Sequence, residues 1–295
     1  MEWLLRLMAS VAIVSTARPV LQARMVIGTT TLLEAWRWGV VALALWSGTW
    51  FVTELVPIVR DGMADQLWLA SAILMVSPFI AALGARQPGS RVWSWFVVLP
   101  VIVVLFLPAV TAWNRDLHPT HLRLEVPMLI GYGLVLVMGA GNYLGTRFAL
   151  PAFLVAAACL TVVWPLSQFA ERFPLQRSAA NAAATLLLSV AAWVGAWQAG
   201  RKKHLRRAAI DRVWNDFRDF FGVVWGRRIM DRINDTGRQE GWPVQMHFEG
   251  LVPVDASKPA DLSPQQLDRV EQALRWLLRR FVEPEWIDQR LSGDR

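Results

Sequence analysis

Six separate apolar blocks run through the first two thirds of the chain, each about as long as a helix that crosses a lipid bilayer. A span needs about 20 mainly apolar residues, because the hydrocarbon layer is ~30 Å thick and a helix rises ~1.5 Å per residue. Backbone groups inside hydrocarbon must find partners within their own segment, which favours helices. The blocks are Trp36–Val56, Gln66–Leu83, Val92–Trp113, Pro127–Leu144, Arg147–Pro165 and Ser178–Trp197. We therefore expect an all-α integral membrane protein with a six-helix transmembrane bundle over residues 36–199.

The N-terminal segment, residues 1–35, leaves the span count open. Its apolar stretch Trp3–Thr16 is short, and Arg6 interrupts its start. Glu2 weakens the basic region that a signal peptide needs, and no clean small-x-small cleavage site follows. We interpret the segment as an amphipathic or partly inserted helix, with a seventh span as the alternative.

The composition changes abruptly after Gly200. Residues 201–295 hold 18 basic and 15 acidic side chains, as in a soluble domain, and their near-balance argues against a nucleic-acid partner. With six spans, the connections on the tail's side carry eleven Arg and Lys, and those on the other side carry five. This asymmetry predicts that both termini are cytoplasmic and that the protein lies in a plasma or inner membrane. A seventh span would move only the N-terminus outside.

A basic cluster marks the boundary between the last block and the tail. It is a typical stop-transfer anchor, and it also suits contact with anionic lipid headgroups. The cluster consists of Arg201, Lys202, Lys203, Arg206 and Arg207. We expect the lipid bilayer to be its partner.

The middles of the six blocks contain no Asp, Glu, Lys, Arg or His, which counts against a proton-coupled pump. Gly141 and Gly145 form a small-xxx-small pair, which predicts close packing of two helices. Asn142 and Asn181 are predicted to hydrogen-bond between helices. The 17 Trp residues, Trp46 among them, often lie near block ends, where an indole can bury its ring and keep its N–H in water.

The loop over residues 114–125 is the best candidate for a small-molecule site. Asp116, His118, His121 and Glu125 are residue types that ligate zinc or another divalent ion. Pro119 breaks the helix that would align the two histidines, so a hydrated loop without metal is the alternative. The sequence contains no GxSxG, P-loop, HExxH or CxxC motif, and we predict no cofactor.

The tail is expected to be an α-rich cytoplasmic domain, residues 200–295, with at most a short β-hairpin. Apolar residues recur at helical spacing over Ala208–Asn234, with Gly222 and Gly226 as points of close contact or bending. Alternation from Val244 favours a short hairpin that turns at Glu249-Gly250, with an irregular extended segment as the alternative. Ser263, Pro264 and Gln266 predict the start of a last helix that ends at Pro284. The aromatic residues of the first tail helix either pack within the tail or dock on a partner; they include Trp214, Phe217, Phe221 and Trp225.

These features favour a non-catalytic membrane protein that acts as a scaffold, assembly or sensing subunit, with a tail that docks a protein partner or the membrane surface. One alternative is a transporter or permease subunit for an apolar or lipid-like substrate. Another is a membrane enzyme with its site in the loop 114–125.

Overall fold

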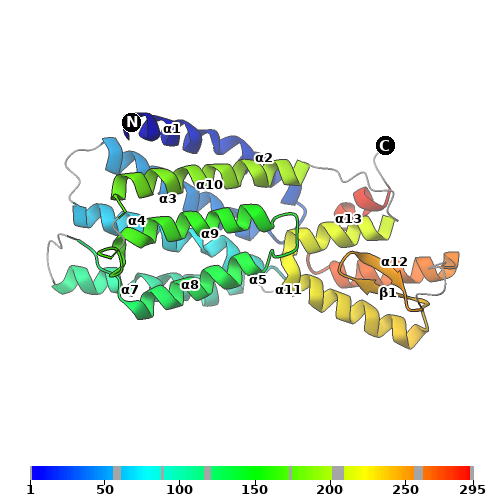
Figure 1. Cartoon of the computed structure of the whole chain (residues 1–295). Coiled ribbons are helices and arrows are strands. Elements are labelled where there is room, and N and C mark those ends of the chain that lie inside the picture. The colour runs from blue at the N-terminus through cyan, green and yellow to red at the C-terminus, as the bar shows by residue number, and fades with distance from the viewer. Residues whose placement is uncertain are drawn as a thin grey trace.

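The computed structural model describes residues 2–55, 61–87, 90–115, 121–172, 175–200, 209–255 and 262–292. This part of the chain is all-α apart from one two-stranded hairpin, as the sequence predicted. The helices of residues 2–200 lie side by side along one direction and form a bundle (Figure 1). The tail packs against one end of this bundle, and the N-terminus lies at the opposite end.

Helical segments that follow one another directly combine into seven rods. Four of the rods contain a break or a change of helix type, at Thr16, at Val76 before Pro78, at the π-helical turn η1, and at the 3-10 turn η2. The rods consist of α1 (Glu2–Ser15) with α2 (Ala17–Ile27); α3 (Leu33–Leu55); α4 (Asp61–Met75) with α5 (Ser77–Leu83); α6 (Ser90–Trp93), η1 (Ser94–Val98) and α7 (Leu99–Arg115); α8 (Val126–Gly141); α9 (Ala149–Val163) with η2 (Trp164–Leu166); and α10 (Arg177–Gly200).

Five described segments are long and apolar enough to cross a membrane. They are Trp3–Ile27, Asp61–Leu83, Ser94–Thr111, Ala149–Leu166 and Arg177–Gly200, while Val126–Gly141 is apolar but shorter. The N-terminal segment is thus a longer apolar rod than we predicted. The first predicted block, now α3, is not among the five, because its polar and charged residues lower its hydropathy. The length and composition of the described helices therefore do not reproduce the predicted count of six membrane spans.

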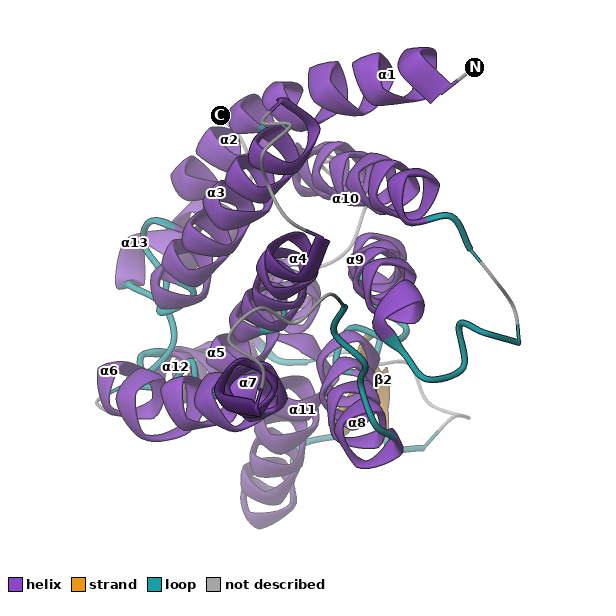
Figure 2. Ribbon diagram, turned by 90° about the vertical axis from the view of Figure 1, so that its left-hand side faces the viewer, coloured by secondary structure: helices purple, strands orange, loops and turns teal. Residues whose placement is uncertain are grey.

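The helix α4 lies at the centre of the bundle, with α3, α7 and α9 packed around it (Figure 2). Trp46 and Trp50 of α3 are fully buried and meet Trp68 of α4 edge to face, at ring centroid distances of 5.5 and 6.4 Å. The Trp46 Nε1–H donates to Thr185 Oγ1 of α10 at 3.1 Å. The expectation that the Trp46 N–H stays in water is wrong, because it bonds to the buried Thr185 of another helix.

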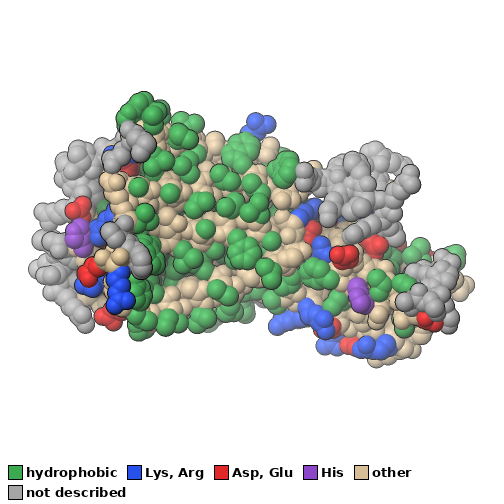
Figure 3. Space-filling model, in the orientation of Figure 1, with side chains coloured by type: hydrophobic (Ala, Val, Ile, Leu, Met, Phe, Trp, Pro, Cys, Tyr) green, Lys and Arg blue, Asp and Glu red, His purple; other side chains and the backbone are tan. Residues whose placement is uncertain are grey.

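The outer surface of the bundle is apolar. Large hydrophobic side chains point outward on several rods, and Phe96 is 76% exposed and Val137 70% exposed. On the face drawn in Figure 3, charged side chains gather at the end of the bundle away from the tail and on the tail itself. Such a continuous exposed apolar surface is rare on soluble monomeric proteins.

The tail consists of α11 (Ala209–Glu240), the strands β1 (Val244–His247) and β2 (Gly250–Pro253), α12 (Pro264–Leu278) and α13 (Pro284–Leu291). The predicted hairpin is confirmed, with Val244 paired to Pro253 and His247 to Gly250. Its turn is Phe248-Glu249, one residue earlier than predicted, because Gly250 already belongs to β2. The predicted capping box is also confirmed, because Ser263 and Gln266 bond reciprocally at the start of α12. The helix α13 was not predicted: Pro284 begins this further helix, whereas we expected Pro284 to mark the end of the last one.

Candidate functional site

The junction between bundle and tail is the most elaborate polar region of the described residues. The loop between α2 and α3 bonds through its backbone to the segment between α12 and α13. Thr31 N–H donates to Phe281 O, and Glu283 N–H donates to Thr29 O, both at 2.9 Å. The loop after α5 joins the same segment, because Gln87 N–H donates to Arg280 O at 2.9 Å.

The loop after α8 contacts α11 where that helix is interrupted. Gly222 has φ 81° and ψ 178°, a conformation that is essentially restricted to glycine. Asn142 fills the break: its Nδ2–H donates to Phe221 O at 3.3 Å, and its Oδ1 accepts from Val224 N–H at 3.0 Å. Its main-chain oxygen accepts from Val223 N–H at 2.7 Å. One asparagine from the bundle thus satisfies backbone groups that the broken helix leaves without partners.

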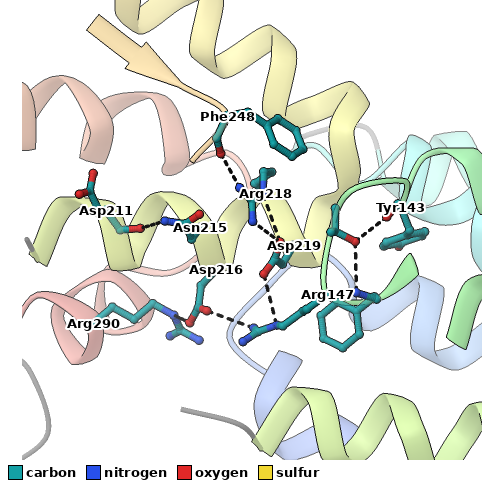
Figure 4. A network of polar contacts seen from close by, with 11 residues as sticks. Tyr143, Arg147, Asp211, Asn215, Asp216, Arg218, Asp219, Phe248 and Arg290 are labelled. Atoms are coloured by element: carbon teal, nitrogen blue, oxygen red, sulfur yellow. Dashed lines mark hydrogen bonds and ion pairs between the residues drawn. The ribbon is translucent and has the colours of Figure 1, made fainter. Parts of the chain in front are cut away.

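A cluster of three arginines and two aspartates extends this contact (Figure 4). Arg147, in the loop between α8 and α9, lies 3.1 Å from Asp216 and 3.5 Å from Asp219, both on α11. Asp219 also binds Arg218 at 2.7 Å, and Asp216 binds Arg290 of α13 at 2.7 Å. Burial lowers the pKa of Arg290, while the neighbouring Asp216 acts in the opposite direction. Both carboxylates are therefore held by arginines, an arrangement that suits mechanical attachment better than proton transfer.

A second polar cluster lies at the other end of the bundle. Asp65 of α4 is 4% exposed, and its carboxylate accepts from Arg177 Nη1 at 2.8 Å and from Leu122 N–H at 3.0 Å. Arg177 Nη1 also lies 2.8 Å from His121 Nδ1. These contacts hold the segment before α8 over the end of α4, next to the bridge between Leu124 and Ser167.

The structure separates the predicted metal ligands that it describes. His121 faces Asp65 and Arg177, whereas Glu125 is the N-cap residue of α8. Asp116 and His118 lie outside the described residues. Within the described part, no group of three or more His, Cys, Asp or Glu side chains could hold a metal ion.

The glycine pair that we predicted for helix packing is placed differently. Gly141 ends α8, and a Cβ added there would meet nothing within 4 Å. Gly145 lies beyond the helix with φ 76°, and a Cβ added there would lie 3.4 Å from the Phe248 ring of the tail. The close approach along α8 occurs instead at Gly139, where an added Cβ would lie 2.6 Å from Phe79 Cβ.

The two asparagines also differ in their positions. Asn142 does bond between helices, but its partner is α11 of the tail and not another rod of the bundle. Asn181 is partly buried on α10. The basic cluster Arg201, Lys202, Lys203, Arg206 and Arg207 lies outside the described residues.

The four aromatic residues that we considered for partner docking are buried inside the tail. Trp214, Phe217 and Phe221 are fully buried, and Trp225 is 7% exposed. Phe281 packs edge to face against the last three. The alternative of packing within the chain therefore accounts for this aromatic stripe, and these side chains offer no docking surface.

Asp65 and Arg147 were not predicted as site residues. Both lie at the edge of an apolar block. A single charged residue in that position carries no local signal of its distant partners. No family model, curated protein or solved structure matches this chain.

Proposed function

We propose that this chain is an integral membrane protein whose bundle spans the bilayer. The five long apolar segments support this placement, and so does the outward-facing apolar surface between two polar ends. The excess of Arg and Lys in the tail-side connections supports a cytoplasmic tail in a plasma or inner membrane. The N-terminal rod then forms a seventh span, which places the N-terminus on the side opposite the tail.

Within this framework the protein acts as a non-catalytic sensing subunit, whose tail transmits the state of the bundle to a protein partner. One observation carries the proposal: all three described bundle loops at the tail end are bonded to the tail. The loops after α2, α5 and α8 contribute Thr31, Gln87 and Asn142 to these bonds. A shift of α2, α5 or α8 along or around its axis would therefore be transmitted to the tail through these bonds.

The Arg147→Ala variant tests this function. It removes the cation shared by Asp216 and Asp219, and breaking such a largely buried ion pair costs about 2–3 kcal/mol. The matched control is Arg227→Ala. The Arg227–Asp231 pair lies on α11, the helix that carries Asp216 and Asp219, but it is exposed and contributes about 0–1 kcal/mol.

Hydrogen exchange of α11 and quantitative mass spectrometry of proteins that co-purify in mild detergent form the paired readout. We expect Arg147→Ala to speed exchange in α11 and to deplete a partner that wild type and Arg227→Ala retain. If exchange rises while the co-purifying proteins stay the same, the tail does not signal through this junction, and the sensing function is wrong.

A further inference from the structure

An apolar cavity of about 380 Å³ lies between helices of the bundle, open to its outer surface, near the end that carries the tail. Its walls come from α2, α3, α5, α9 and α10, and Phe148 and Phe220 also line it. The wall contains no charged side chain. The residues that line the cavity include Val20, Gly39, Leu43, Val155, Leu188 and Ala199.

The cavity is elongated along the helices. Its lining residues on α10 run from Leu188 to Ala199, which is ~16 Å of helix axis. An apolar surface of that length can accommodate an extended stretch of a hydrocarbon chain. The volume also falls within the roughly 300–1,000 Å³ of ligand pockets.

The chemistry of the walls selects an apolar occupant. A polar group placed there would lose its hydrogen bonds to water without replacement, and apolar cavities of this kind do not hold water stably. In the membrane placement proposed above, the nearest apolar molecules are the acyl chains of the leaflet on the tail side. The lining residues of α2 and α10 belong to the ends of those helices that are nearest the tail (Figure 1).

A cation lies beside one wall of the cavity. The exposed guanidinium of Arg24 stacks on the Trp36 ring at 5.5 Å from its centroid, and Trp36 lines the cavity. The Trp36 Nε1–H donates to Val20 O at 2.9 Å, which fixes the ring between α3 and α2. A phosphate next to Arg24 would therefore belong to a lipid whose chain can enter between these helices.

We propose that this cavity binds one acyl chain of a phospholipid from the tail-side leaflet, with the lipid phosphate at Arg24. The tail-facing end of the cavity is close to the junction, because Phe220 belongs to α11 and packs on Phe148 with ring centroids 5.3 Å apart. Arg147 covers both rings, at 5.1 and 5.0 Å. The lipid site rests on the proposed membrane placement, and its effect on the tail rests on the sensing function.

Two glycine substitutions fill the cavity from different walls. A Cβ at Gly39 would lie 3.7 Å from Pro78 Cγ, and a Cβ at Gly195 would lie 3.8 Å from Pro151 Cβ, both ordinary contacts. We therefore choose Gly39→Leu and Gly195→Leu. The control is Gly48→Leu, on the same helix as Gly39, because its added Cβ would meet nothing within 4 Å and it does not line the cavity.

The probe is a phosphatidylglycerol with a photoreactive diazirine near the end of one acyl chain, incorporated into phosphatidylcholine nanodiscs with the purified protein. We expect crosslinks at Leu188 and Val155 in wild type and in Gly48→Leu, and an at least tenfold loss in both cavity-filling variants. We also expect Arg24→Ala to reduce the crosslinks when the probe competes with unlabelled phosphatidylcholine. The lipid site would be overturned if the crosslinks were spread evenly over the outer surface and if their yield in either cavity-filling variant equalled that of wild type.

Hydrogen exchange of α11 in the same nanodiscs separates the two proposals. Loss of crosslinks with faster exchange in α11 supports both the lipid site and the coupling to the tail. Loss of crosslinks with unchanged exchange supports the lipid site and overturns the sensing function. Since Gly39 and Gly195 lie on different helices, agreement between their variants excludes misfolding at a single position as the cause.

Discussion

The side-chain oxygen of Asn142 accepts the backbone N–H of Val224 at 3.0 Å, across the point where Gly222 interrupts α11. A helix that is broken in its middle leaves N–H and C=O groups without intrahelical partners. Here a residue of the bundle replaces them, so the tail helix has its full set of hydrogen bonds only while it is docked. The geometry of the tail and that of the bundle therefore depend on each other.

The first prediction concerns Asn142→Ala. The substitution leaves Val224 N–H and Phe221 O without their side-chain partners, which costs about 2–4 kcal/mol in the free energy of unfolding. Thermal unfolding in detergent measures the loss. Asn181→Ala, which removes the same amide from α10, serves as the control, and an equal loss in both variants would contradict a special role for Asn142.

The second prediction concerns Gly222→Ala. The backbone at this position costs a non-glycine residue about 1–3 kcal/mol, and the added Cβ would also lie 2.2 Å from Asn142 Nδ2. Gly241→Ala is the matched control, because Gly241 has φ 67° but its added Cβ would meet nothing within 4 Å. We expect Gly222→Ala to lower the unfolding temperature clearly more than Gly241→Ala. Equal shifts would mean that only backbone strain matters at Gly222.

The third prediction concerns Asp65→Asn at the far end of the bundle. The change removes the charge that holds Arg177 and weakens the acceptor of the Leu122 N–H, so it leaves a buried site without its ion pair. We expect faster hydrogen exchange in residues 121–125 and lower thermal stability. Glu171→Gln should change neither, because the Arg123–Glu171 pair is exposed. An unchanged exchange rate in Asp65→Asn would show that the loop does not depend on this carboxylate.

The fourth prediction concerns the topology of the chain. Cys159 is buried and is the sole cysteine, so a Cys159→Ala background allows single cysteines to be placed and labelled. In intact cells, a membrane-impermeant maleimide should label Trp3→Cys and Leu175→Cys, while Gln265→Cys in the tail should react only after permeabilisation. Labelling of Leu175→Cys without labelling of Trp3→Cys would instead support six spans and two cytoplasmic termini.

The fifth prediction concerns the loop 114–125. Arg177 lies 2.8 Å from His121 Nδ1, and this positive charge opposes a divalent cation at the same nitrogen. We expect EDTA to leave the unfolding temperature unchanged and zinc content to be equal in wild type and His121→Ala. Zinc that co-purifies with wild type but not with His121→Ala would restore the metal-site hypothesis for this loop.

Much of the local structure could be predicted from the sequence, because its signals are short-range. The reciprocal bonds of Ser263 and Gln266 depend on residues three apart, and the hairpin depends on alternation from Val244 with a turn at Phe248-Glu249. Gly222 was also recognised as a point of bending or close contact. Its partner was not, since Asn142 is 80 residues earlier and its role exists only once the tail has docked.

The candidate sites were less predictable for the same reason. Trp46 was expected near water, but the polar partner of its N–H is Thr185, which is 139 residues away. The aromatic stripe of α11 gave the correct periodicity, but it could not reveal that Phe281 from a distant helix end covers it. Periodicity identifies which face is buried, and the three-dimensional structure identifies what buries it.

The bonds between the tail and the loops after α2, α5 and α8 also set an order for biogenesis. These loops leave the ribosome long before residues 278–287, which pack in one core with Leu32, Ala82 and Ala85. Domains fold from the N-terminal side during synthesis, so this later segment closes a core whose other half is already in place. A bundle that inserts incorrectly leaves residues 278–287 without a surface to fold on.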